Sequence, residues 1–358
     1  GWSEHARRCP GASSVVHSVI TNMRGNAPYD RGLFMRTAIW KKGFDAVRLH
    51  WPRWRKYVAG AFFLLVAILL VRLALGIDWR EVARAFRALS PATLAIAGGL
   101  AVLSYGIYCC YDLLGRYLTG HSLGTGRVML ITFISYAFNL SFGAMVGGAA
   151  FRFRLYSRAG IDPGTITRVL ATSVVTNWVG YLLLAGVLLA TRTVSLPDSW
   201  VGGTLLQAIG AGLTVLFAAY LSFILLLARP ELRFRGHELP LPGRRLAWLQ
   251  VTMSVSNWVV MGAVVYTLLP DGAASYPVVL GALLLGAIAG VVTHIPAGVG
   301  VIEAVFLAVL GGSVPQHQVL ASLLAYRVVY YLVPLAIAAV AYVTTEASRG
   351  ASGVAREA

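Results

Sequence analysis

One long apolar stretch of the chain is interrupted near its middle. Residues 278 to 310 contain THIPAGVGVIE at 293 to 303. A second interruption lies in the stretch 128 to 149, where the chain reads NLSFGAMVGGAA from 139 to 150. Glycine and proline break or bend a helix at such points. These two interruptions therefore decide how the apolar chain folds.

The composition identifies the class of protein. Of 358 residues, 58% are apolar and only 12% are charged, and the mean hydropathy is +0.71. A soluble domain carries about 25% charged residues. The chain therefore predicts an all-α polytopic membrane protein, and a spanning helix needs about 20 residues. Eight apolar segments are present, at about 57–75, 93–114, 128–149, 167–190, 204–228, 247–269, 278–310 and 318–345.

The basic residues indicate how the segments cross. The chain holds 30 Lys and Arg against 14 Asp and Glu, a net charge of +16. If the two interrupted segments enter and return on the same face, 24 basic residues lie on one side and 4 on the other. That asymmetry satisfies the positive-inside rule. It predicts six full transmembrane helices plus two re-entrant helical hairpins, with both termini cytoplasmic.

Eight plain crossings remain the alternative topology, and they would place the four arginines of residues 150–168 outside. Two broken segments entering from opposite faces are typical of transporters. A basic chain also suggests nucleic acid, but the hydropathy argues against such a partner.

The domain boundaries follow the hydropathy. Residues 1–56 form a basic, partly disordered cytoplasmic tail, with Met35 as an alternative start, and 57–345 form the membrane domain. Residues 346–358 are a short cytoplasmic tail. Between the first two segments, residues 77–91 carry apolar side chains near helical spacing, with arginines between them. This pattern predicts an interfacial amphipathic helix.

Ionisable side chains inside a bilayer are costly and often functional. Glu303 follows the second interruption, and Arg327 lies in the last segment near Tyr330. Either charge alone would be uncompensated, so we expect the two to lie together, in a structural or a gating role. Asp112 is expected at the interface beside Arg116.

Two further kinds of polar side chain lie in the apolar segments. His294 precedes the Pro break, where exposed carbonyls can satisfy it. Asn177 and Asn257 lie well inside their segments, and amides at that depth commonly hydrogen-bond between helices.

The first interruption leads directly into the basic run FRFRLYSR at 151 to 158. Small residues let backbone approach a ligand, and arginine forks suit a phosphate. A lipid phosphate is one candidate ligand, while close helix packing and loop orientation are the alternative use of the same residues. The candidate translocation residues of this first interruption are Asn139, Gly143, Gly147, Gly148, Arg152 and Arg154. Those of the second interruption are Pro296, Gly298, Gly300, Glu303, Arg327 and Tyr330.

The sequence offers no enzyme motif that we recognise. GxSxG, Walker A and HExxH patterns are missing, as is a paired-carboxylate site. Cys109 and Cys110 are adjacent, so we expect buried thiols rather than a metal site or a disulfide. We therefore expect no catalytic residue, metal or cofactor. The expected partners are bilayer phospholipids, with a homodimer or a separate soluble enzyme as further assemblies.

Taken together, these motifs resemble a known family. NLSFGAMVGGAAFRFRLYSRAG, HIPAGVGVIEAVFLAVL and LAYRVVYYLVPL are similar to the transmembrane region of bacterial lysylphosphatidylglycerol synthase/flippase proteins (MprF-like) and of stand-alone YbhN-like membrane proteins. The most specific piece is P-x-G-x-G-x-x-E, at Pro296 to Glu303. Arg327 and Pro334 follow it, and a less specific patch of Gly147, Gly148, Arg152 and Tyr156 precedes it.

The resemblance implies a flippase unit acting on aminoacyl-phosphatidylglycerol or another lipid headgroup. In two-part members of the family a cytoplasmic synthase domain makes the lipid, and the 358 residues of this chain do not contain one. We therefore expect a phospholipid transporter rather than an enzyme. The alternative is a membrane subunit of an enzyme that modifies a lipid or a lipid-linked glycan, with the catalytic part on a separate chain.

Overall fold

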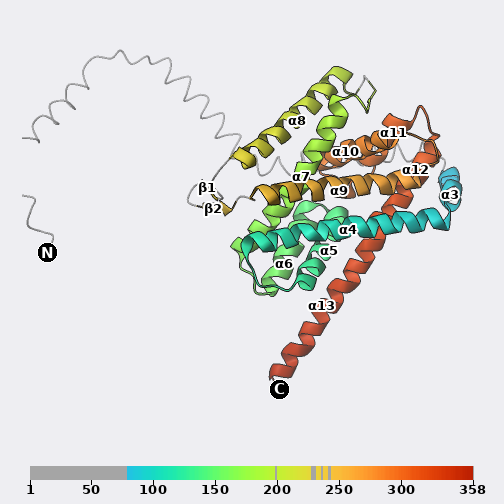
Figure 1. The fold of residues 1–358 in the computed structure, drawn as a ribbon. Helices are drawn as coiled ribbons and strands as arrows, with labels where there is room; N and C mark the ends of the chain where they lie inside the picture. Colours follow the sequence, from blue (N-terminus) through green and yellow to red (C-terminus); the bar gives the residue numbers. More distant parts are fainter. Residues whose placement is uncertain (1–78, 198–199, 227–230, 235–236, 241–242, 358) are drawn as a thin grey trace, which may run out of the picture. The chain divides into compact units, whose positions relative to one another are not determined.

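The computed structural model describes residues 79–357 except 198–199, 227–230, 235–236 and 241–242, and these residues belong to one compact unit (Figure 1). Its elements in chain order are α3 (Trp79–Arg87), α4 (Pro91–Thr119), α5 (Thr125–Phe142), the π-helix η1 (Ala144–Ala149), α6 (Ala150–Arg158), α7 (Pro163–Ala190), α8 (Gly203–Leu226), β1 (Glu231–Phe234), β2 (His237–Pro240), α9 (Arg244–Leu268), α10 (Tyr276–Thr293), the 3-10 turn η2 (Pro296–Gly298), α11 (Val301–Leu310), α12 (Gln316–Arg327), the π-helix η3 (Val328–Leu332) and α13 (Val333–Glu357).

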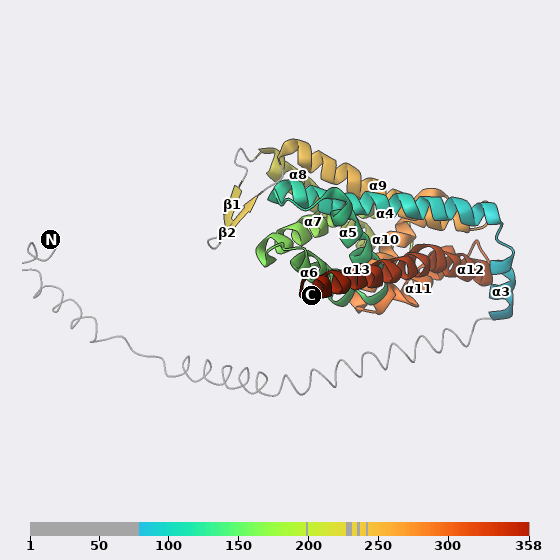
Figure 2. The same ribbon diagram turned by 90° about the horizontal axis from the view of Figure 1, so that it is seen from below.

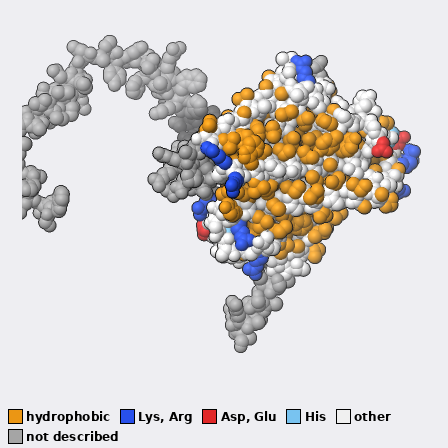
Figure 3. All heavy atoms as spheres, viewed as in Figure 1, with side chains coloured by type: hydrophobic (Ala, Val, Ile, Leu, Met, Phe, Trp, Pro, Cys, Tyr) orange, Lys and Arg blue, Asp and Glu red, His pale blue; other side chains and the backbone are white. Residues whose placement is uncertain are grey.

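Long apolar helices make up most of the described chain. Helices α4 and α9 lie side by side, and α7 packs against both of them and against α8 (Figures 1 and 2). By length and composition, six spans are able to cross a membrane, and α12, η3 and α13 together count as one of them. Hydrophobic side chains dominate the face shown in Figure 3, while the arginines are most numerous towards its left side, with others at the top and at the right-hand end. The predicted all-α polytopic fold is thus confirmed.

Three points of the sequence-based prediction are not covered by this confirmation. The tail 1–56 and the first predicted crossing, 57–75, lie outside the described residues. Helix α10, assigned to a hairpin from the sequence, is itself one of the six potential spans. Strands β1 and β2 add a short antiparallel ladder between α8 and α9, pairing Glu231 with Pro240 and Phe234 with His237.

Capping residues set where the long helices begin and end. Helix α4 begins at Pro91 after Ser90, whose hydroxyl accepts a hydrogen bond from the Thr93 amide at 3.0 Å. It ends at Gly120, which adopts the left-handed conformation (φ +69°) that glycine tolerates at a helix end. Helix α7 begins in the same way, with Asp162 as N-cap before Pro163.

Both interrupted segments fold back on themselves. After α5 the chain turns at Gly143 and returns through η1 and α6, and the Tyr156 ring reaches within 6.0 Å of His121 in the loop before α5. Helix α10 likewise turns at residues 294–300 into α11, and Ser313 donates a hydrogen bond to the Ala273 carbonyl at 3.4 Å. Each segment therefore starts and ends at the same end of the bundle.

The two hairpins belong to opposite ends of the bundle. The first returns to the C-terminal end of α4, beside the loop at residues 120–124. The second returns to the N-terminal end of α4, because Thr93 lines the same pocket as Pro270 and Ala273 in the turn before α10. The chain thus reverses direction at opposite ends of the bundle, while the re-entrant character of both segments stays a prediction.

Two further helices carry sequence predictions. Helix α3 lies within the predicted amphipathic segment, and its buried Val82 packs with Leu320 and Ala321 of α12. Helix α13 continues through Glu357, so most of the segment expected as a short tail extends the last helix (Figure 1).

Candidate functional site

The first hairpin delivers an arginine to a carboxylate on a neighbouring helix. The Arg152 Nε atom of α6 lies 3.1 Å from Oδ2 of Asp112 on α4. Tyr156 donates a hydrogen bond to the same oxygen at 3.0 Å, and Ser173 of α7 donates to Oδ1. The side chains of Asp112 and Arg152 are only 0% and 3% exposed. Three helices thus enclose one ion pair.

This geometry corrects one sequence prediction. The sequence suggests an interfacial Asp112 beside Arg116, but Asp112 is fully buried and pairs with Arg152. The Arg116 guanidinium instead donates to the Thr125 hydroxyl at 2.8 Å. The reason is the fold of the first hairpin, whose return arm carries Arg152 back to the last turns of α4. A buried carboxylate needs such a partner, because its desolvation is otherwise uncompensated.

Arg152 is held on several sides without being fully satisfied. Its guanidinium lies 5.7 Å from the centre of the Tyr108 ring, within cation–π distance. Its Nη2 atom is buried and has no hydrogen-bond partner within the part of the chain that the structure describes. The arginine therefore retains a donor that a further acceptor could use.

The glycines of the first hairpin serve close packing. A Cβ atom at Gly147 would collide with the Phe138 carbonyl of α5, and one at Gly148 would meet the Asn139 side chain at 2.8 Å. Gly143 makes the reversal itself, with φ +87°. These candidate residues therefore bring the two arms into backbone contact. Arg154 is exposed, and its guanidinium lies 5.6 Å from the centre of the Tyr342 ring on α13.

The second hairpin holds the predicted Glu303–Arg327 pair. Arg327 Nε lies 2.6 Å from Glu303 Oε1, and Nη2 lies 2.9 Å from Oε2. This bidentate geometry is the strong form of an arginine–carboxylate interaction. Glu303 also accepts the Gly300 amide at 2.8 Å, which ties the pair to the start of α11. The expectation that the two charges lie together is confirmed.

The broken backbone of the second hairpin supplies further acceptors to Arg327. The carbonyls of Ala297 and Gly298 accept from its Nη1 and Nη2 atoms at 3.0 and 3.2 Å. Ala297 and Gly298 both have positive φ, as does Gly300 at +80°. A non-glycine residue in that region is strained, and such strain is common at functional sites. Of the predicted site residues, Pro296 begins the 3-10 turn η2.

His294 ends α10 in the left-handed conformation, at φ +55°. Its Nδ1 atom lies 3.0 Å from the Val292 carbonyl, as expected for a histidine satisfied at the break.

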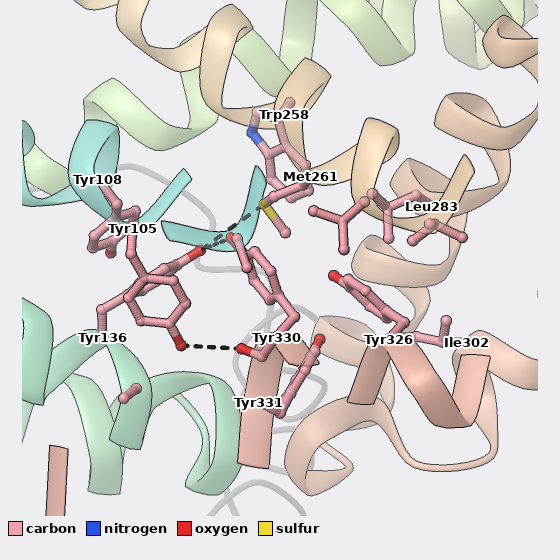
Figure 4. Close-up of a cluster of buried hydrophobic side chains, with 14 of the residues drawn as sticks. Tyr105, Tyr108, Tyr136, Trp258, Met261, Leu283, Ile302, Tyr326, Tyr330 and Tyr331 are labelled. Carbon is pink, nitrogen blue, oxygen red and sulfur yellow. Dashed lines mark hydrogen bonds between the residues drawn. The ribbon is translucent and has the colours of Figure 1, made fainter. Parts of the chain in front are cut away.

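A cluster of buried tyrosines, drawn in Figure 4, contacts the arginine of each ion pair. The Tyr330 hydroxyl, from η3, hydrogen-bonds with Ser104 at 2.6 Å and with Tyr136 at 3.2 Å. Ser104 in turn donates to Asn257 of α9 at 2.7 Å, which confirms the interhelical role expected for that amide. A row of contacts joins the two arginines, running from Arg152 through Tyr108, Tyr136, Tyr330 and Tyr331 to Arg327. Each step is a contact with or between rings except Tyr136–Tyr330, which is the hydroxyl hydrogen bond.

Sequence reasoning finds one of these pairs and misses the other. Glu303 and Arg327 stand out as isolated charges in apolar surroundings. Asp112 has Arg116 close by in the sequence, and the arginines at 152, 154 and 158 are an available signal for a different partner. The sequence gives no indication of the tyrosine hydroxyl network beyond the number of tyrosines that it contains. Within the described residues no three metal-ligating side chains come together, and Cys109 is buried.

Comparison with known proteins gives a consistent set of relatives. Residues 58–338 match the family described as the lysylphosphatidylglycerol synthase TM region. The inner membrane protein YbhN of Escherichia coli (strain K12) is 46% identical over 300 residues, which cover 82% of this chain and 94% of that protein. An uncharacterized protein of Synechocystis is 31% identical, over 72% of this chain and 80% of its own length.

A more distant relative is a longer protein. The phosphatidylglycerol lysyltransferase of Staphylococcus aureus is 26% identical over 295 residues. The match covers 78% of this chain but only 32% of the lysyltransferase. Because the family match spans most of the sequence, this chain belongs to the lysylphosphatidylglycerol synthase TM region family.

Proposed function

We propose that this protein moves phospholipid between the leaflets of the bacterial inner membrane, without a catalytic site of its own. The observation that carries the proposal is the pair of opposed hairpins, each of which brings one charged side chain into an ion pair within the bundle, one buried and one partly exposed. Opposed broken helices that meet inside a bundle are how many transporters build a substrate path. Charges kept inside apolar helices are costly, so their retention favours a role in transport.

The second pair is the better candidate for contact with a headgroup. Its side chains are each 15% exposed, and its guanidinium already binds a carboxylate in the bidentate geometry that a phosphate also accepts. A lipid phosphate can therefore replace Glu303 on Arg327 while the carbonyls of Ala297 and Gly298 hold the arginine in place. The released Glu303 carboxylate then becomes free to take up a proton. Transport of this kind is passive or ion-coupled.

The first hairpin serves the cytoplasmic side in this proposal. Both termini and the basic loops at that end face the cytoplasm, in accordance with the positive-inside rule. In this proposal the two hairpins are re-entrant and approach each other near the midplane of the membrane. The polar side chains between them form a polar seam there. The tyrosine row between Arg152 and Arg327 lines this seam with hydroxyl groups that a moving headgroup can use.

Translocation of fluorescent phosphatidylglycerol in liposomes tests the proposal. Purified wild-type protein should raise the rate above that of protein-free liposomes. Glu303→Gln should lower the gain about tenfold, equivalent to about 1.4 kcal/mol in the barrier. Glu81→Gln is the matched control, because Glu81 lies in α3 with a side chain that is 42% exposed. Unassisted rates from wild-type protein in several lipid mixtures would overturn the proposal.

A second candidate function follows from the lysyltransferase relative. That longer protein carries a segment similar to this chain as about a third of its length, so this chain can act as the membrane subunit of a lipid-modifying enzyme. Reconstitution separates the two functions. A membrane subunit should be inactive alone in liposomes and should gain activity only with a soluble partner.

A further inference from the structure

A pocket opens where the first hairpin begins. It has a volume of about 440 Å³, within the range of small-ligand sites, and lies between the end of α4 and the start of α5. Its lining residues are Leu113, Arg116, Tyr117, Gly120, His121 and Thr125. The lining contains arginine and histidine and no carboxylate. This charge pattern favours an anionic ligand.

Arg116 is positioned to donate into this pocket. A guanidinium has five N–H donors, and within the described residues only the Thr125 hydroxyl accepts from it, at 2.8 Å. Arg116 also lies in the last turn of α4, where the helix dipole stabilises a cation. The remaining donors are therefore available to a ligand.

The start of α5 contributes to the same wall. Gly124 is the N-cap residue and supplies no side-chain hydrogen bond, so the first amides of α5 need other acceptors. Amides at a helix N-terminus favour anions, and α5 is 18 residues long. Thr125, the first residue of α5, lines the pocket together with Arg116.

His121 gives an independent indication of a ligand. Its Nδ1 atom accepts a hydrogen bond from the Leu123 amide at 3.4 Å. Burial, and secondly the charge on Arg116, lowers the pKa of His121, which favours the neutral ring. A neutral ring that accepts at Nδ1 must carry its proton on Nε2. Within the described chain this Nε2 atom is buried and has no partner.

We infer that this pocket binds the phosphate of a glycerophospholipid, with Arg116 as its main ligand and the start of α5 and His121 as further donors. The lipid source is favoured over free phosphate because Leu113 and the 73% exposed ring of Tyr117 line the same pocket. Aromatic side chains of this kind favour the membrane interface.

The inference goes beyond the proposed transport, because binding at this pocket is measurable whether or not lipid crosses the bilayer. It also connects to the first hairpin. His121 lies against the Tyr156 ring at 6.0 Å, and Tyr156 donates to Asp112. Two side chains, His121 and Tyr156, would therefore connect a phosphate in the pocket to the Asp112–Arg152 pair.

Native mass spectrometry of the full chain in detergent tests the assignment. Phosphatidylglycerol should bind well and diacylglycerol weakly, because only the former has a phosphate. Arg116→Gln should weaken phosphatidylglycerol binding about tenfold, as expected for losing a charged hydrogen-bond donor. Arg127→Gln is the matched control, since Arg127 is exposed in the first turn of α5 and does not line the pocket.

Three further results decide the assignment. Equal weakening by Arg116→Gln and Arg127→Gln would overturn it, because binding would then depend only on surface charge. If inorganic phosphate displaces the bound lipid in competition, the ligand of the pocket is free phosphate and not a lipid headgroup. If Arg116→Gln does not fold, Thr125→Val replaces it, and unchanged binding in that variant would also overturn the assignment.

Failure of the pocket assignment is distinguishable from failure of the transport proposal. If the pocket variants bind lipid normally while Glu303→Gln still lowers translocation, only the pocket assignment falls. If the pocket binds lipid and wild-type protein moves none, only the transport proposal falls.

Discussion

The two hairpins hold similar ion pairs in different surroundings. Asp112 and Arg152 are sealed, at 0% and 3% exposure, and two hydroxyl groups complete the carboxylate shell. Glu303 and Arg327 are each 15% exposed, and backbone carbonyls rather than hydroxyls complete the shell. A sealed pair can only be broken by unfolding its surroundings, whereas a partly open pair can exchange a partner for a ligand. The difference indicates a fixed joint in the first hairpin and a working contact in the second.

Breaking the sealed pair should have the largest effect on stability. Asp112→Ala leaves the Arg152 charge buried without a counter-ion, a loss of about 3 to 5 kcal/mol. Thermal unfolding in detergent measures it, with Asp271→Ala, an exposed carboxylate, as control. Replacing both partners, as Asp112→Leu with Arg152→Met, should recover part of the loss. An unfolding temperature of Asp112→Ala equal to that of the control would show that the sealed pair does not hold the first hairpin.

Breaking the partly open Glu303–Arg327 pair should lower the free energy of unfolding by a smaller amount. Glu303→Ala removes the acceptor of two Arg327 hydrogen bonds and of the Gly300 amide. Water and the carbonyls of the break can still reach Arg327, so we expect about 1.5 to 3 kcal/mol. The same unfolding measurement applies. A loss equal to that of Asp112→Ala would mean that both pairs are structural joints.

Removing the Tyr330 hydroxyl, which lies between the two ion pairs, should lower the stability of the protein by less than breaking either pair. Tyr330→Phe removes the hydrogen bonds with Ser104 and Tyr136, at a cost of about 1 kcal/mol. Tyr326→Phe is the matched control, because the Tyr326 hydroxyl is buried without a partner among the described residues. Unfolding temperatures should fall for the first variant only. The reverse order would show that this hydroxyl network does not stabilise the bundle.

The smallest effect concerns pH at the helix that follows the first hairpin. Hydrogen bonds from Thr165 lower the pKa of Asp162, the exposed N-cap of α7. A lowered pKa means that the folded state gains stability above the usual pKa of aspartate, about 3.9, and loses it as the pH falls through the lowered value. Asp162→Asn keeps an acceptor but no charge. Its unfolding temperature should lie slightly below that of wild type at pH 7 and converge with it in acid.

Most of the bundle is predictable because it depends on local signals. Apolar length predicts the helices, and Pro and Gly predict the two breaks. The Glu303–Arg327 pair is predictable because both charges stand alone in apolar sequence. The Asp112–Arg152 pair is not, since its formation requires knowing that the α6 arm returns beside the end of α4. Pairing of that kind depends on tertiary geometry, which spacing along one chain does not contain.

The π-helical turn η3 separates Arg327 from α13. A π turn accommodates one residue more than an α-helical turn, and one residue of an α-helix corresponds to a rotation of about 100°. Deleting a single residue from Val328–Leu332 would therefore convert the π turn into an α turn and leave Arg327 and α13 facing as they do now, whereas a deletion within α13 itself would rotate the rest of that helix by about 100°. The extra residue of η3 is thus the one position in this span where a single residue can be lost without changing which side chains α12 and α13 present to the bundle.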